Sequence, residues 1–235
     1  MRFFKWCMSA GVLLFGLYPL FCTEQISPYT EQKISELLNP YVIMGLENKT
    51  DAALHKISAL EAEIETTLPS MAIDLEQERL ILQSLCLMER RHYQYDTKTK
   101  SPELQAAFKE QFKKNEQWLL AHEGKPANKW LLLFTGDLTS CYMVRSLSAT
   151  IGYGMHVRRL YERALENNKT FALAYINLGL WRQYAPKIFG GGEEKAFEEY
   201  TKAFACATTD SERYIASIYL SQYWFTKNDK ETCES

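Results

Sequence analysis

The stretch FGGGEEKAFEEYTKAF, residues 189–204, decides how the last third of the chain folds. Three glycines before a helix can bind a phosphate through their backbone N–H groups, or they can form the bend between two packed helices. A phosphate-binding loop is normally followed by Lys and by Ser or Thr. Here Glu193 and Glu194 follow instead, and their carboxylates complement the positive end of the helix dipole and repel an anion. The sequence therefore predicts a bend, with Gly192 near the N-cap of the second helix.

The helices around this bend share a packing pattern. A small or branched residue, a tyrosine and an alanine recur at i, i+4 and i+7 before the bend and again after it, and the helix between carries a related set at i, i+3 and i+4. The repeat-packing residues are Val157, Tyr161 and Ala164, then Tyr175, Leu178 and Gly179, then Ala196, Tyr200 and Ala203. Small residues beside aromatic rings allow two helices to approach closely.

This pattern resembles the tetratricopeptide repeat (TPR), in which units of about 34 residues pair two antiparallel helices. Val157 and Ala196 lie 39 residues apart, and the excess falls in the turn at residues 185–192. A last helix that starts at Asp210 would cap the open end of such a repeat.

The rest of the chain is also predicted to be helical, because apolar residues recur every three or four positions and strand-like alternation is absent. Asp51 is the expected N-cap of one helix. Other helices are expected over 70–95, 102–122 and 130–144, with a short joint at 152–154. In the segment 70–95 the charged residues, among them Glu78 and Glu89, are expected mostly off the buried face.

The predicted fold class is all-α, with antiparallel helix pairs that form a short TPR-like α-solenoid. We divide the chain into a signal peptide at 1–22, an N-terminal helical part at 23–150, and degenerate TPR-like pairs with a capping helix at 151–235. The last two parts are expected to form one continuous helical domain.

The N-terminus has the layout of a secretory signal. Arg2 and Lys5 precede residues 6–22, which carry no charge, and Pro19 breaks the apolar run. The stretch before Pro19 is shorter than the roughly 20 residues that a membrane span needs. We therefore expect export to the periplasm or cell envelope.

Two processing routes fit the end of this signal. Leu20-Phe21-Cys22 resembles the lipobox of bacterial lipoproteins, which makes Cys22 a candidate for lipidation and the protein a candidate for a lipid anchor. A lipobox has a small residue where Phe21 stands, so ordinary cleavage after Cys22 or Thr23 is the second route.

Composition and motifs exclude several functions. The formal net charge of −2 leaves no basic footprint for nucleic acid. None of the four histidines belongs to a metal-binding pair, and no nucleophile motif is present. We expect no catalytic residue, metal or cofactor. Cys86 and Cys206 are expected to be buried free thiols, and one disulfide outside the cytosol is the alternative.

The repeat region is similar to TPR-like envelope proteins of bacteria, and to the T component of tripartite ATP-independent periplasmic (TRAP) transporters in particular. The residues that carry the resemblance are Ala185-Pro186, Phe189-Gly190-Gly191-Gly192 and Lys195-Ala196. The resemblance implies an all-helical, partner-binding lipoprotein whose partner is a periplasmic solute-binding protein.

Two functions follow as hypotheses. The first is a non-catalytic adaptor or scaffold whose concave face holds a protein partner. Its groove candidates lie off the packing stripe of the repeat: Asn177, Arg182, Gln183 and Tyr184. The second is a carrier in which the 14 Tyr, 12 Phe and 5 Trp residues help line a helical pocket for a small apolar or aromatic ligand. A third class, a hydrolase, would need a pocket with a perturbed carboxylate or thiol, and the sequence shows no such cluster.

Overall fold

The computed structural model describes residues 26–46, 50–68, 75–94, 101–143 and 146–226. All regular structure within these ranges is helical, which confirms the predicted all-α fold class. The long helices are α1 Pro28–Leu46, α2 Thr50–Thr66, α3 Leu75–Gln94, α4 Pro102–Ala121, α5 Lys129–Met143, α6 Leu147–Asn167, α7 Ala172–Tyr184, α8 Glu193–Cys206 and α9 Asp210–Thr226. A short 3₁₀ helix, η2, spans Lys187–Phe189.

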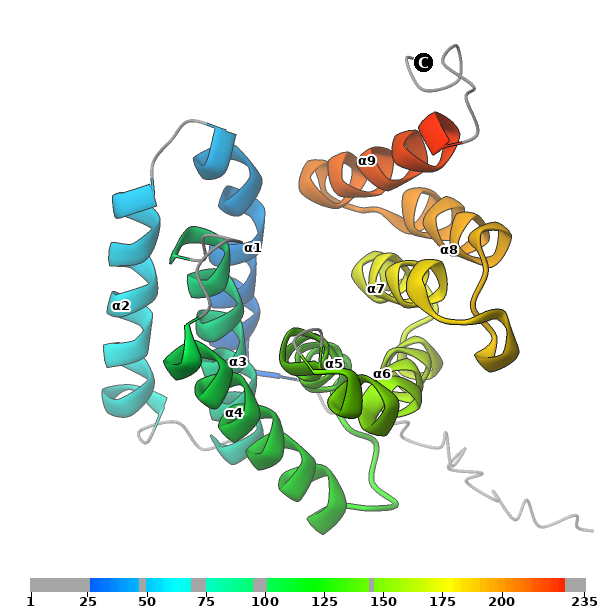
Figure 1. The fold of residues 1–235 in the computed structure, drawn as a ribbon. Coiled ribbons are helices and arrows are strands. Elements are labelled where there is room, and N and C mark those ends of the chain that lie inside the picture. The colour runs from blue at the N-terminus through cyan, green and yellow to red at the C-terminus, as the bar shows by residue number, and fades with distance from the viewer. Residues whose placement is uncertain (1–25, 47–49, 69–74, 95–100, 144–145, 227–235) are drawn as a thin grey trace, which may run out of the picture.

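Consecutive helices pack on one another in a solenoid-like arrangement of two layers (Figure 1). The odd-numbered helices form the inner layer, where α1 contacts α3, α3 contacts α5, α5 contacts α7 and α7 contacts α9. The even-numbered helices pack on the outside of their neighbours. The last inner helix, α9, returns to contact the first, α1. The inner layer therefore closes on itself around a central space.

Two glycines set how closely the helix pairs approach. Gly136 of α5 lies under the ring of Tyr161 of α6, and Gly179 of α7 lies under the ring of Tyr200 of α8. A Cβ atom at either glycine would come within 3.0 Å of the tyrosine ring. The same small-under-aromatic crossing therefore occurs in two successive helix pairs.

The repeat-packing residues lie at these crossings. Val157, Tyr161 and Ala164 are buried, as are their counterparts in α8, Ala196, Tyr200 and Ala203. In α7, Leu178 and Gly179 are buried, whereas Tyr175 is half-buried and donates its hydroxyl to the Lys169 carbonyl at 3.1 Å.

The glycine run forms the expected bend between α7 and α8. Gly190 and Gly192 have positive φ angles of 92° and 135°, and Gly192 is the N-cap of α8, as predicted. Two arginines fix the bend, because Arg158 donates to the Phe189 carbonyl at 3.1 Å and Arg182 donates to the Gly190 carbonyl at 2.9 Å.

The joint expected at 152–154 is wrong, because α6 is continuous through it. The helix begins early, where the Ser146 side chain accepts a hydrogen bond from the Ala149 amide at 3.3 Å. The carbonyl of Gly154 is also tied to α7, since it accepts from Trp181 Nε1 at 2.7 Å. Similarly, α2 begins at Thr50, so Asp51 lies in its first turn.

The expected exposure of the charged residues in α3 is also wrong in part. Glu78 and Glu89 are only 2% and 3% exposed. The reason is that α3 contacts α1, α2, α4 and α5, so little of its surface faces solvent. Glu78 accepts hydrogen bonds at its carboxylate from the Ser27 amide, at 2.8 Å, and from the Thr30 hydroxyl.

Several expectations fall on other parts of the chain. The signal peptide at 1–22 and the lipidation candidate Cys22 lie outside the described residues. Within the described ranges, no helix combines the length and apolarity that crossing a membrane requires. Cys86 is a buried free thiol as expected, whereas Cys206 is half-buried.

Candidate ligand-binding pocket

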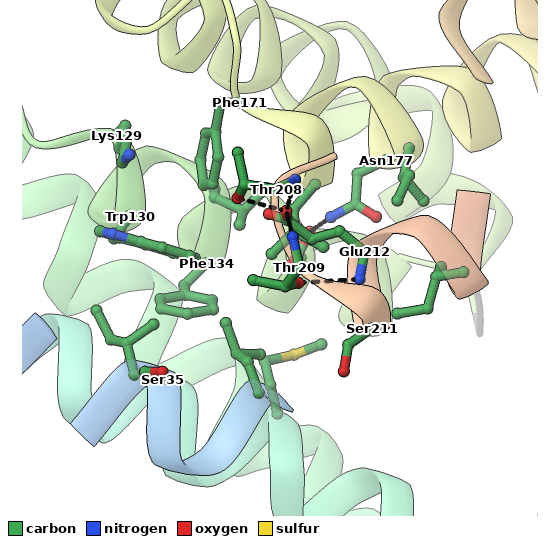
Figure 2. A pocket seen from close by; sticks show the side chains of 18 of the residues that line it. Ser35, Lys129, Trp130, Phe134, Phe171, Asn177, Thr208, Thr209, Ser211 and Glu212 are labelled. Carbon is green, nitrogen blue, oxygen red and sulfur yellow. Dashed lines mark hydrogen bonds between the residues drawn. The ribbon is translucent and has the colours of Figure 1, made fainter. Parts of the chain in front are cut away.

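The inner layer surrounds a cavity of about 900 Å³ that is partly open to solvent. Its walls come from α1, α3, α5, α7 and α9 and from the loops that precede α7 and α9. Figure 2 shows Ser35 of α1, Trp130 and Phe134 of α5, and Thr209 and Glu212 near the start of α9 around this space. Segments more than 170 residues apart in the sequence thus line one cavity.

One wall is a cluster of aromatic rings. Trp130 stacks on Phe134 with ring centroids 5.7 Å apart and meets Phe171 edge-on at 4.7 Å. The Lys129 ammonium lies over the rings of Phe171 and Trp130, at 4.9 and 5.6 Å from the centroids. Burial lowers the pKa of Lys129. Such rings offer a flat apolar surface to a ligand.

The start of α9 forms the opposite wall and is held by a capping box. The Glu212 carboxylate accepts hydrogen bonds from the Thr208 and Thr209 amides at 2.8 and 3.2 Å, and the Thr209 hydroxyl accepts from the Glu212 amide at 3.2 Å. This reciprocal pattern satisfies the free N–H groups of the first turn. The sequence carries the signal for it in Thr209-Asp210-Ser211-Glu212.

A carboxyl group from α5 reaches the cavity between two hydrogen-bond donors. Asp137 accepts from the Tyr161 hydroxyl at 2.9 Å and from Asn177 Nδ2 at 2.7 Å. Burial raises the pKa of Asp137 to about 7, against the opposing effects of the Tyr161 hydrogen bond and of the nearby Arg91 charge. Asp137 is therefore held in place by α6 and α7.

A second carboxyl group reaches the cavity from α3. Glu89 is only 3% exposed, and its Oε2 atom has no hydrogen-bond partner within the described part of the chain. Burial raises the pKa of Glu89 to about 8. A buried polar oxygen without a partner is unfavourable, so this atom marks a place where a ligand donor would be stabilising.

The two carboxyl groups come from α3 and α5, which are in contact, and both line the cavity. Cys141 Sγ is 3.9 Å from Met88 Sδ, and Met88 directly precedes Glu89. Asp137 lies one helical turn before Cys141 on α5, toward the cavity-lining residues Leu133 and Phe134. The polar region of the cavity therefore comes from adjacent helices of the inner layer.

The four groove candidates are placed in different environments. Asn177 lines the cavity and binds Asp137. Arg182 pairs with Glu199 at 3.1 Å, and Gln183 accepts from the Tyr200 hydroxyl at 2.7 Å. Tyr184 is 79% exposed and does not line the cavity. The structure therefore brings only Asn177 of this set to the pocket.

Most of the pocket residues were not singled out from the sequence. Thr208 and Thr209 precede the predicted start of α9, and Trp130 and Phe134 belong to a helix that is apolar on most faces. The contacts of α7 with α5 and α9, and of α9 with α1, bring these segments to one cavity. No local pattern signals these contacts.

The described part of the chain is thus all-helical and solenoid-like, and its inner layer surrounds a largely apolar pocket with a buried carboxyl group, Glu89, and a half-buried one, Asp137. No family model, curated protein or solved structure matches it.

Proposed function

We propose that the protein is a non-catalytic carrier that binds a small, largely apolar ligand in the cavity of its inner layer. The observation that supports this function best is the cavity itself, since about 900 Å³ falls in the range of pockets that hold small molecules. Its aromatic wall and its few polar groups are the usual composition of such sites.

The closed inner layer favours a small molecule over a folded partner in this space. A solenoid that binds proteins on its concave face leaves that face open along its length. Here α9 contacts α1, which narrows the concave side to a partly open cavity. A binding role is also consistent with Asp137, whose carboxyl is already held by Tyr161 and Asn177.

Filling the cavity is expected to abolish ligand binding. Ser35 is an exposed residue of α1 that faces the cavity, so Ser35→Trp would place an indole in the ligand space at little cost to the fold. With the neutral fluorescent probe 1-pyrenemethanol, we expect the dissociation constant to rise about tenfold or more, as a steric conflict of about 1.4 kcal/mol or more produces.

The matched control is Gln117→Trp, an exposed position on the outer helix α4. This variant should bind the probe like the wild-type protein. Equal probe affinity for the wild-type protein and Ser35→Trp would refute the cavity as the binding site, and so would an absence of probe binding to the wild-type protein.

A second candidate function is a TPR-like adaptor for a protein partner. It is favoured by three large side chains on and beside the turn between α7 and α8, because Tyr184, Ile188 and Phe189 are 79%, 87% and 51% exposed. Exposed apolar groups in a cluster are typical of interaction sites. We propose, on the resemblance to TRAP T components, that the partner is a periplasmic solute-binding protein and that export, with lipidation at Cys22 or ordinary cleavage, brings the two together.

The adaptor function predicts capture of that partner. A cross-linked pull-down from envelope extract, read by mass spectrometry, should recover a solute-binding protein with the wild-type chain and less of it with Ile188→Asp. Undiminished capture by Ile188→Asp would show that this surface is not the docking site, and recovery of the bait alone would count against the adaptor function.

A further inference from the structure

The ligand's polar group is defined by the charges that line the cavity. Among the described residues, the carboxyl groups of Glu31, Glu89, Asp137 and Glu212 line it together with the ammonium group of Lys129. Glu212 is engaged in the cap of α9, and Lys129 lies over the aromatic rings. Glu31 is exposed, so Glu89 and Asp137 are the carboxyl groups that line the polar region of the cavity.

Glu89 is 3% exposed, and no donor within the described ranges of the chain reaches its Oε2 atom. A carboxylate only accepts hydrogen bonds, and the strongest donors to it are cationic. Asp137 adds a second acceptor on the adjacent helix α5. Because both groups are desolvated, their interaction with a cation is screened less than it would be at the surface.

We propose that the ligand is an apolar or aromatic amine, whose protonated amino group binds Glu89 and Asp137 while its body lies against the aromatic wall of Trp130, Phe134 and Phe171. This inference rests on the proposed carrier function. It deepens that function by naming the chemical class of the ligand.

The charge of the ligand is tested with three probes that share one apolar body: 1-pyrenemethylamine, 1-pyrenemethanol and 1-pyreneacetate. At pH 8.5 the wild-type protein should bind the amine about tenfold or more tightly than the alcohol, and the acetate most weakly. A hydrogen bond to a charged group contributes a free energy that corresponds to a factor of about ten or more in the dissociation constant. Fluorescence titration of each probe gives the three dissociation constants.

The Glu89→Gln variant should reduce the preference for the amine to within about threefold while the alcohol binds as before, because the variant removes a charge and keeps the shape. The control is Glu123→Gln, which changes an exposed carboxyl group outside the cavity and should retain the preference, since exposed charges are screened.

The preference should also fall between pH 8.5 and pH 6.0, because Glu89 and Asp137 take up protons as their pKa values of about 8 and about 7 are crossed. The amine stays protonated over this range and the alcohol is uncharged.

The other titratable and charged groups that line the cavity or act on these two are Glu31 of α1, Arg91 and His92 of α3, Lys129 and Cys141 of α5, Tyr161 of α6, and Glu212, Tyr214 and Tyr219 of α9. Burial lowers the pKa of His92 to about 4 and raises that of Cys141 to about 12, so neither changes charge between these two pH values.

The outcomes separate this inference from the function on which it rests. Tighter binding of the amine, lost in Glu89→Gln and at pH 6.0, supports it. Equal binding of the amine and the alcohol by the wild-type protein would overturn it while leaving the carrier function standing. If none of the three probes binds, both the inference and the carrier function are wrong.

Discussion

Replacing Glu89 by glutamine is expected to stabilise the protein, and increasingly so as the pH rises. Burial raises the pKa of Glu89 from its ordinary value of 4.5 to about 8. The folded chain therefore holds this proton more tightly than the unfolded chain, and the contribution of Glu89 to stability falls as the pH rises through this range. Glutamine has nearly the same shape and carries no charge at any of these pH values.

The expected difference in the free energy of unfolding, in favour of Glu89→Gln, is on the order of 1 kcal/mol at pH 5 and on the order of 4 kcal/mol at pH 8.5, because each pKa unit corresponds to about 1.4 kcal/mol. Urea unfolding at both pH values measures it. The control is Glu123→Gln, which alters an exposed residue after α4 and should give no such gain. A variant less stable than the wild-type protein at pH 8.5 would mean that Glu89 is ionised and well paired in the folded chain.

Gly179→Ala is expected to destabilise the protein although alanine favours helices. The added Cβ atom would lie within 3.0 Å of the buried Tyr200 ring, and Tyr200 is 1% exposed, so the ring has little room to move. Overpacking of this kind costs about 1–3 kcal/mol. Thermal or urea unfolding gives the value.

Gly152→Ala is the matched control, because Gly152 also lies within a helix but an added Cβ atom there meets open space. It should stabilise the protein by about 0.5–1 kcal/mol, the usual gain of alanine over glycine in a helix. If both variants shift the free energy of unfolding in the same direction, Gly179 is not required for the close contact between α7 and α8.

Local patterns predicted the helices and the repeat crossings well. The spacing of Tyr161 and Tyr200 with small residues marked the packed faces of α6 and α8, and the acidic pair after the glycines placed Gly192 at the N-cap. These features depend on residues within one or two turns of each other, so a single sequence reveals them.

The pocket depends on a contact that local patterns do not encode. Glu89 was expected off the buried face because a charged residue on an amphipathic helix normally faces water. It is buried because α3 is covered on several sides by other helices. Asp137 belongs to a predominantly apolar helix, and its hydrogen-bond partners Tyr161 and Asn177 come from two other helices, so no local pattern indicated its role.

Two of the groove candidates illustrate the converse. Arg182 and Gln183 are polar and lie off the apolar stripe, which is why they were candidates for partner binding. In the structure Arg182 pairs with Glu199, and Gln183 bonds Tyr200. Long polar side chains near a helix crossing can serve the crossing itself, and sequence position alone does not separate the two roles.

The most direct test of the carrier function is native mass spectrometry of the protein purified from the cells that make it. We expect the wild-type protein to carry one bound small molecule and Ser35→Trp, purified in the same way, to be free of it. A bound molecule present equally in both proteins would contradict the proposed pocket, and a wild-type protein that is repeatedly free of any small molecule would contradict the carrier function.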